Sequence, residues 1–220
     1  MEISSERLAY WYFRLNGFLG LENFIVHEGL NTSDSATEID LLGIRFMHRR
    51  ELYEHSSHKW MKDDLELLNF CPKDKIFIVF AEVKEGSPRI NPSWFNDSRS
   101  MLKLLHALGC ISGRKKVIDK ISRKIQKYGY CNIHRYHISF AVVGNSKNRD
   151  NVPFIKIPVI SWSQVLDFIY NRFNRYRIVK TNLGEWKEEL QGKELRNSVT
   201  NSGSLDDFKS KMRGDNVWLS

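Results

Sequence analysis

Two apolar stretches with charged residues set into them decide the fold: Thr37-Glu38-Ile39-Asp40-Leu41-Leu42-Gly43 and Ile76-Phe77-Ile78-Val79-Phe80-Ala81-Glu82-Val83-Lys84-Glu85-Gly86. Each is an apolar run, which is typical of a buried strand. Because side chains alternate across a strand, Glu82 and Lys84 share one face and Val83 lies on the other. Glu38 and Asp40 share a face in the same way. If the two strands pair, Asp40, Glu82 and Lys84 can meet at one edge of the sheet.

Working outward from these stretches, helical and strand patterns alternate along the chain. Ser4 or Ser5 is a suitable N-cap for a first helix that runs to about residue 16. Pro158 breaks the last apolar run, so that strand is expected at an edge. The expected elements are strands over 24–28, 38–47, 76–83, 136–143 and 155–160, and helices over 5–16, 92–108, 114–127 and 162–173, with a further helix inside the excursion 48–75. This order predicts an α/β fold with a mixed central sheet of about five strands flanked by helices.

Composition and charge limit the classes of protein. The 220 residues are 41% hydrophobic and 27% charged, which is typical of a globular chain. The formal net charge of +8 favours a polyanionic partner, although a basic soluble surface gives the same charge. Three sparse cysteines indicate no disulfide framework and fit a reducing cytoplasm. Residues 1–6 lack the positive region of a signal peptide, and no apolar run reaches the 18 residues expected of a membrane span.

A change of composition divides the chain in two. We expect one domain over residues 1–180, with an insertion at about 48–75, and a polar C-terminal extension over 181–220. Residues 197–204 are rich in Ser, Thr, Asn and Gly and have the composition of a linker. Residues 205–212 can form a short amphipathic helix. Its Phe208 and Met212, with Trp218 beyond, could dock a partner.

These residues resemble the PD-(D/E)XK superfamily of restriction-endonuclease-like nucleases. The matching residues are Asp40 in Glu-Ile-Asp-Leu-Leu and Glu82-Val83-Lys84 at the end of the apolar strand. Glu6 is the best candidate for the acidic residue that this superfamily carries on its first helix. The resemblance spans about residues 4–175. It departs from the common pattern in having Ile39 before the motif aspartate and a long gap before Glu82, which the insertion 48–75 explains.

The resemblance implies a restriction-endonuclease-like core and a metal-dependent mechanism. Asp40 and Glu82 would bind one or two Mg²⁺ ions, or Mn²⁺ in their place, together with the backbone carbonyl of Val83. The metal would lower the pKa of a bound water, and Lys84 would orient that water or help to deprotonate it. Glu6 would join through the metal or a water, while Glu38 would support the site from outside. Glu82 and Lys84 could instead be an ordinary ion pair on one strand face.

A second signal is a strongly basic helix. Its Lys and Arg residues recur every three or four positions and form a ridge suited to a phosphate backbone. A solvated outer helix face is the alternative interpretation. The candidate nucleic-acid-binding residues are Lys115, Lys116, Lys120, Arg123, Lys124 and Lys127. Arg172, Arg175, Arg177 and Lys180 form a weaker basic group. Trp94, just after the motif, could approach a substrate.

Together these features predict a Mg²⁺-dependent endonuclease, most simply a DNA nuclease in bacterial defence or DNA repair. It could act as a homodimer or with a partner protein that supplies targeting. Two alternatives stay open: a catalytically degenerate scaffold subunit that binds nucleic acid, and an RNase of the same fold. The spacing Cys131-x-x-His134-x-x-His137 favours packing or surface roles over a zinc site, because the paired ligands of such sites are absent.

Overall fold

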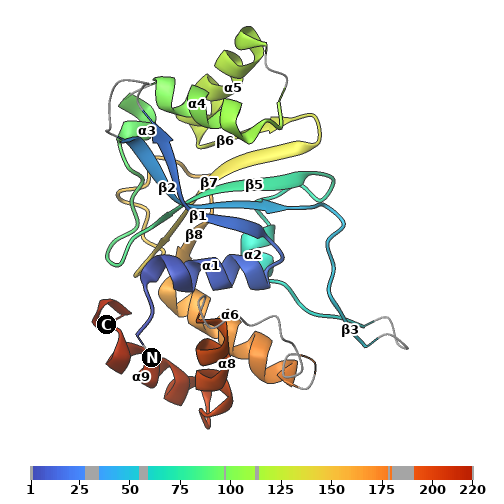
Figure 1. Cartoon of the computed structure of the whole chain (residues 1–220), viewed down its shortest axis with the longest axis vertical. Helices are drawn as coiled ribbons and strands as arrows, with labels where there is room; N and C mark the ends of the chain where they lie inside the picture. The colour runs from blue at the N-terminus through green and yellow to red at the C-terminus, as the bar shows by residue number, and fades with distance from the viewer. Residues whose placement is uncertain are drawn as a thin grey trace.

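The computed structural model describes residues 2–27, 35–54, 59–96, 98–111, 114–177, 179 and 191–219. A six-stranded mixed sheet crosses the molecule, with helices on both faces (Figure 1). The strand order is β1-β2-β5-β7-β6, and β8 also pairs with β7. The strands are β1 (Leu19–His27), β2 (Ser35–Arg45), β5 (Ile76–Val83), β6 (Tyr130–Ile133), β7 (Tyr136–Gly144) and β8 (Val159–Ser161). The prediction of an α/β fold with a mixed sheet is confirmed, with one strand more than expected.

The two central strands, β5 and β7, run parallel to each other. Both are buried almost throughout, as their continuous apolar sequences predict. On one side β2 pairs with β5 antiparallel, and β1 pairs with β2 antiparallel at the edge. On the other side β7 pairs with β6 antiparallel and with β8 parallel. Residues 46–75 therefore connect two neighbouring strands, and their description as an insertion stays a prediction.

Helices form a layer on each face of the sheet (Figure 1). One layer holds α1 (Ser5–Leu15), α6 (Trp162–Arg175), α8 (Gly192–Thr200) and α9 (Leu205–Asp215). The other holds α3 (Ser93–Asn96), α4 (Ser98–Leu108) and α5 (Lys115–Tyr128). Each layer shares a hydrophobic core with one face of the sheet. None of the helices in the described part of the chain has the length and apolar character needed to cross a bilayer.

The insertion differs from the prediction. Trp60 lies not in a helix but in a small hairpin of β3 (Leu52–Glu54) and β4 (Lys59–Trp60), where Leu52 pairs with Trp60. Among the described residues of this segment only the short α2 (Leu65–Leu68) is helical, with Asp64 as its N-cap. The apolar residues between 60 and 68 therefore belong to two elements, separated by the irregular segment 61–64, and Leu67 lies in the core.

Three further expectations need correction. The strand β6 escaped prediction, since only Cys131 among its four residues is fully buried. The last strand is limited to Val159–Ser161, and Ile155 is exposed. Residues 197–200 belong to α8 rather than to a linker, because Leu195 and Val199, four residues apart, are buried against the core.

The C-terminal helices pack on the chain itself. Phe208 and Met212 of α9 are buried in the core shared with α1 and α6. Trp218 lies edge-on against Trp162, with 4.7 Å between ring centroids. The side chains expected to dock a partner are therefore already covered within the chain. The expected division at residue 180 stays a prediction, and residues 181–190 lie outside the described part.

Candidate active site

The candidate site lies where β2 separates from β5. Backbone pairing between these strands ends at Leu41 opposite Ala81, and the same register would set Asp40 opposite Glu82. At this point the carboxylate of Asp40 replaces a backbone acceptor: Oδ2 accepts the Val83 N–H at 2.6 Å. This hydrogen bond from the next strand holds the Asp40 carboxylate at the place where β2 and β5 diverge.

Lys84 joins the two predicted carboxylates. Its Nζ donates to Asp40 Oδ2 at 3.0 Å and lies 3.0 Å from Glu82 Oε2. The structure therefore brings Asp40, Glu82 and Lys84 together, as the sequence predicted. The side chains of Asp40 and Lys84 are each 21% exposed, whereas that of Glu82 is 2% exposed. Solvent thus reaches the cluster from the side of Asp40 and Lys84.

Trp94 packs against the Glu82 carboxylate. Its Nε1 donates to Glu82 Oε1 at 2.8 Å, and the indole is completely buried. Gln126 of α5 in turn donates to the Trp94 carbonyl at 3.1 Å. Trp94 therefore lies in the core and positions a carboxylate, so the alternative that it approaches a substrate fails. Its role could not be found from sequence, because no motif spacing links an indole to an acid twelve residues before it.

The backbone of Lys84 is fixed from two sides. Its N–H donates to the Val143 carbonyl of β7 at 2.9 Å, and its carbonyl accepts the Trp162 Nε1 proton at 3.1 Å. Trp162 begins α6, whose N-cap is Ser161. These two hydrogen bonds fix the backbone of Lys84 at the end of β5, from which its side chain extends to the two carboxylates.

Burial sets the electrostatics of the cluster. Burial raises the pKa of Glu82, and the nearby Lys84 ammonium offsets this only in part. Burial alone would lower the pKa of Lys84, but the Glu82 and Asp40 carboxylates outweigh it, so this pKa is raised. Lys84 is therefore an ammonium at neutral pH. With both acids ionised, the cluster carries two negative charges and one positive charge.

The donor set suits a hydrated hard cation. Asp40 Oδ1 accepts no hydrogen bond from the described residues, and the Lys84 ammonium already shows that a cation can sit between the two carboxylates. Mg²⁺ is commonly held by one or two carboxylates, with waters and phosphate oxygens completing its shell. Among the described residues, no three His, Cys, Asp or Glu side chains converge on one point. The Val83 carbonyl, waters and substrate would have to supply the remaining ligands.

The two accessory acids form no hydrogen bond or ion pair with the cluster in the described part of the chain. Glu6 is in the first turn of α1, near Glu22. Burial raises the pKa of Glu22, Arg7 offsets this in part, and the negative charge of Glu6 adds to the increase. In the described part of the chain, Glu6 makes no hydrogen bond to the cluster. Glu38 is exposed on β2, beyond the point where the strands separate. The proposed roles of both stay predictions.

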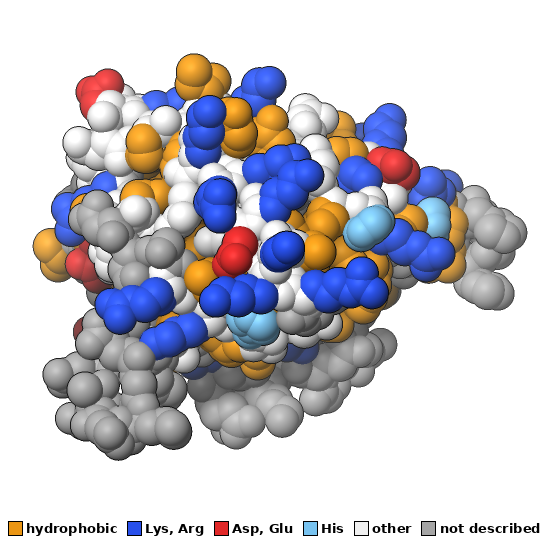
Figure 2. Space-filling view, turned by 90° about the horizontal axis from the view of Figure 1, so that it is seen from above, with side chains coloured by type: hydrophobic (Ala, Val, Ile, Leu, Met, Phe, Trp, Pro, Cys, Tyr) orange, Lys and Arg blue, Asp and Glu red, His pale blue; other side chains and the backbone are white. Residues whose placement is uncertain are grey.

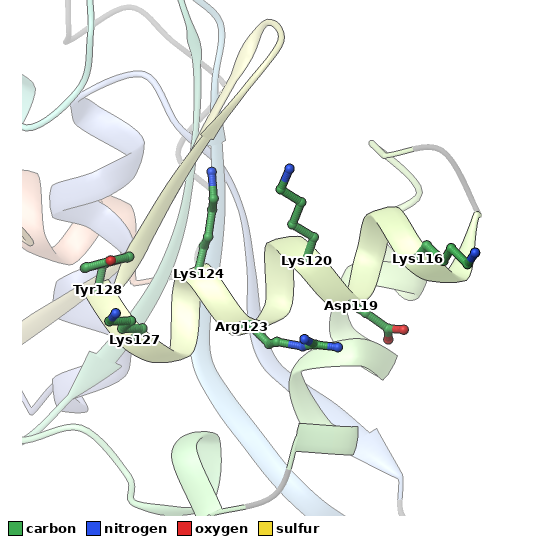
Figure 3. A pocket seen from close by; sticks show the side chains of 7 residues that line it. All are labelled: Lys116, Asp119, Lys120, Arg123, Lys124, Lys127 and Tyr128. Atoms are coloured by element: carbon green, nitrogen blue, oxygen red, sulfur yellow. The ribbon is translucent and has the colours of Figure 1, made fainter.

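The basic helix is α5, and all six predicted Lys and Arg residues on it are exposed. Ile118, Ile121 and Ile125 form its buried face. Figure 3 shows Lys120 and Lys124 standing on one side of the helix, with Asp119 the single acid nearby. Seen from this end of the molecule, Lys and Arg side chains dominate the surface (Figure 2). The helix is linked to the cluster through Gln126, Trp94 and Glu82.

The weaker basic group does not lie on one surface. The Arg172 side chain is fully buried, and its Nη2 donates to the Leu15 carbonyl at 2.7 Å. It also lies 3.1 Å from Glu51 Oε2 and 3.2 Å from Asp63 Oδ1. Arg172 therefore ties α6 to the insertion, and the prediction that it faces nucleic acid is wrong. Lys180 lies outside the described residues.

Comparisons with models of protein families, with curated proteins and with solved structures found no match. The assignment of the candidate site therefore depends on the geometry of its residues.

Proposed function

We propose that this chain is a metal-dependent nuclease with a restriction-endonuclease-like core. The observation that carries the proposal is the contact of Asp40, Glu82 and Lys84 at a partly exposed point where two strands separate. Two carboxylates and an ammonium at one place are the groups that metal-assisted phosphodiester hydrolysis uses. The resemblance noted in the sequence supports the same reaction.

Each residue has a distinct task in this proposal. Asp40 and Glu82, with the Val83 carbonyl, would hold Mg²⁺, which supplies a bound water of lowered pKa and charge for the phosphate. Lys84 keeps its proton, so it acts by orienting the attacking water and by neutralising charge near the scissile phosphate. Trp94 keeps Glu82 in place and excludes water from its buried oxygen. Asp40 Oδ1, which accepts no hydrogen bond from the described residues, would be the oxygen available to the metal.

The proposed substrate is DNA, bound through its phosphates. The exposed cations of α5 supply a sequence-independent attraction, and α5 is connected to the cluster through Trp94. An RNase acting through the same residues is the related alternative. Roles in defence or repair, a homodimer and a targeting partner rest on the resemblance alone.

One observation favours a different class of function. Lys84 bridges both carboxylates at 3.0 Å, as it would in a structural ion cluster with no metal. A scaffold subunit that binds nucleic acid without cutting it would keep this cluster and the basic helix. Both functions involve salt-sensitive binding, and only the nuclease requires a divalent metal.

The test is cleavage of supercoiled plasmid in Mg²⁺, Mn²⁺ or EDTA. The wild type is compared with Asp40→Asn and Lys84→Ala, and Glu85→Gln is the matched control, since Glu85 is exposed next to the motif. We expect metal-dependent nicking that both cluster variants lose and the control retains. Cutting retained in the cluster variants would refute the site. Intact binding without cutting by the wild type would favour the scaffold.

A further inference from the structure

A second basic cavity lies at the opposite end of the sheet from the carboxylates. It has a volume of about 800 Å³ and opens where β2 ends and β5 begins, between the β3–β4 hairpin and α2. Five cations line it, against one lining carboxylate, Asp63: they are Arg45, Arg49, Arg50, Lys73 and Lys75. Asp40 is five residues from Arg45 along β2, so the two sites are roughly 17 Å apart.

The inner cations of this cavity are structural. Arg45 Nη2 lies 2.8 Å from Asp63 Oδ2, and its Nε donates to the Asn16 carbonyl at 2.9 Å. Arg49 pairs with Asp63 at 2.9 Å and with Glu51 at 2.7 Å. These guanidiniums are paired with carboxylates and held in place. They form a rigid wall rather than a free binding group.

The outer cations are different. Arg50 and Lys73 are exposed, and among the described residues neither pairs with a carboxylate. The Arg50 guanidinium lies 5.5 Å from the ring centroid of Trp60, which is 38% exposed. Lys75 Nζ donates to the His134 carbonyl, and it pairs with no carboxylate of the described residues. The rim thus combines free positive charge with an accessible aromatic ring.

The cavity also has an apolar part, formed by Met47, Met61, Leu65 and Leu68. An apolar wall, an accessible indole and unpaired cations together suit a ligand with a flat ring and a phosphate. Stacking on Trp or Arg planes is how proteins bind unpaired bases of any sequence. The volume lies within the range of small-molecule sites. Inorganic phosphate alone would leave the apolar wall and Trp60 without a role.

We infer that this cavity binds a nucleotide, with the base stacked on Trp60 and the phosphate held by Arg50 and Lys73. The nucleotide is either free or an unpaired residue of a single strand, because both present the same groups. The inference goes beyond the proposed nuclease activity, and it does not require that the chain cut any bond. It assigns the insertion 48–75 a binding role separate from the carboxylate site.

The experiment follows tryptophan fluorescence in EDTA, so that no cleavage occurs. The probes are thymidine monophosphate, the single strand (dT)10 and inorganic phosphate. We expect saturable quenching by a nucleotide probe that is lost in Trp60→Leu and weakened about tenfold in Arg50→Ala/Lys73→Ala. Lys156→Ala is the matched control, since Lys156 is an exposed lysine that does not line the cavity. Circular dichroism melting checks that each variant is folded.

Each outcome has a meaning. Equal quenching by both nucleotide probes indicates a free nucleotide, and much tighter binding of (dT)10 indicates a strand. Unchanged quenching in Trp60→Leu, unchanged affinity in Arg50→Ala/Lys73→Ala, quenching by phosphate alone, or no saturation up to about 1 mM would overturn the inference. Loss of nucleotide binding in Lys120→Ala/Lys124→Ala would also overturn it, because the ligand would then be on α5. Plasmid cleavage is scored separately, so either proposal can fail while the other stands.

Discussion

Two clusters of buried charge lie at opposite ends of the sheet, and they are built differently. Asp40, Glu82 and Lys84 meet where β2 and β5 separate. Arg172, with Asp63 and Glu51, lies between α6 and the insertion. In the second cluster, Arg172 Nη1 and Nη2 donate to two backbone carbonyls as well as to the two acids. In the first, two acids share one ammonium and one oxygen of Asp40 accepts nothing from the described residues.

This difference separates a structural cluster from a reactive one. Asp63 receives hydrogen bonds from Arg45, Arg49 and Arg172, so its negative charge is fully compensated by neighbouring arginines. The Asp40 cluster keeps an excess negative charge next to solvent. A protein interior tolerates such an imbalance at a cost in stability, and groups of this kind concentrate at functional sites. The first cluster is therefore expected to control activity and the second to control stability.

The largest expected effect is on cleavage. Lys84→Ala or Asp40→Asn should lower the rate of plasmid nicking by at least about 100-fold, because each removes a group that faces the phosphate. Arg172→Met should leave the rate per folded molecule within about threefold, since Arg172 touches no part of the site. Single-turnover cleavage at saturating Mg²⁺ measures both. An equal loss of cleavage rate in variants of both clusters would contradict the division into a reactive cluster and a structural one.

The converse experiment measures stability. Arg172→Met removes a buried guanidinium that donates to Glu51, to Asp63 and to two backbone carbonyls, and should lower the free energy of unfolding by about 3–5 kcal/mol. Lys84→Met should cost less, because Asp40 is partly exposed, Glu82 keeps its hydrogen bond from Trp94, and the Lys84 ammonium donates to no backbone carbonyl of the described residues. Urea unfolding followed by circular dichroism provides the values. A larger loss for Lys84→Met would mean that the carboxylate cluster is the main structural element.

A smaller effect is expected from the group that holds Glu82. Trp94→Phe keeps the buried ring but removes the Nε1–H donor to Glu82 Oε1. Partners of this kind change metal affinity or activity by about 10–100-fold. Cleavage rates as a function of Mg²⁺ concentration should show a raised requirement for metal with an unchanged rate at saturation. Phe95→Leu is the control, as Phe95 packs nearby without contacting the acid. An unchanged metal requirement in Trp94→Phe would show that the indole only fills space.

The sequence predicted the first cluster because its residues lie in two strands with clear patterns. The bounds of β5 matched the apolar run 76–83, and the alternation of Glu82 and Lys84 followed from strand geometry. The second cluster could not be predicted, since Arg172 lies more than 100 residues along the chain from both Asp63 and Glu51. Trp94 was missed for a related reason. Its contact with Glu82 depends on how α3 packs, and no local pattern encodes that packing.

Predictions also failed where packing overrode local composition. Residues 197–200 are polar enough for a linker, yet the burial of Leu195 and Val199 stabilises α8. Trp60 lies among apolar residues with a helical spacing but pairs with Leu52 in a hairpin. In each case the deciding interaction comes from another segment of the chain. The candidate site was predictable to the extent that neighbouring strands, rather than distant helices, build it.

The salt dependence of binding tests whether α5 serves the first cluster. Lys120→Gln/Lys124→Gln removes two exposed cations that pair with no acid of the described chain. The slope of the logarithm of the DNA association constant against the logarithm of the salt concentration should become shallower by about 1 for each phosphate that the variant no longer neutralises. Fluorescence anisotropy with a labelled DNA duplex in EDTA measures it, and Lys156→Gln is the control. An unchanged slope would mean that α5 is a solvated outer face.

The smallest expected effect is the pH dependence that burial gives Glu82. Its pKa is raised above the usual 4.5, so the folded protein holds this proton more tightly than the unfolded chain does. The resulting stability is complete below the usual pKa and is lost as pH rises through the folded value.

Glu82→Gln cannot titrate and can still accept the Trp94 hydrogen bond. The melting temperature of Glu82→Gln minus that of the wild type should therefore increase from about pH 4 to about pH 7, as measured by thermal denaturation in EDTA. A flat difference would mean that Lys84 fully compensates the burial of Glu82. The first cluster would then be as balanced as the second, and the contrast between them would no longer point to a reactive site.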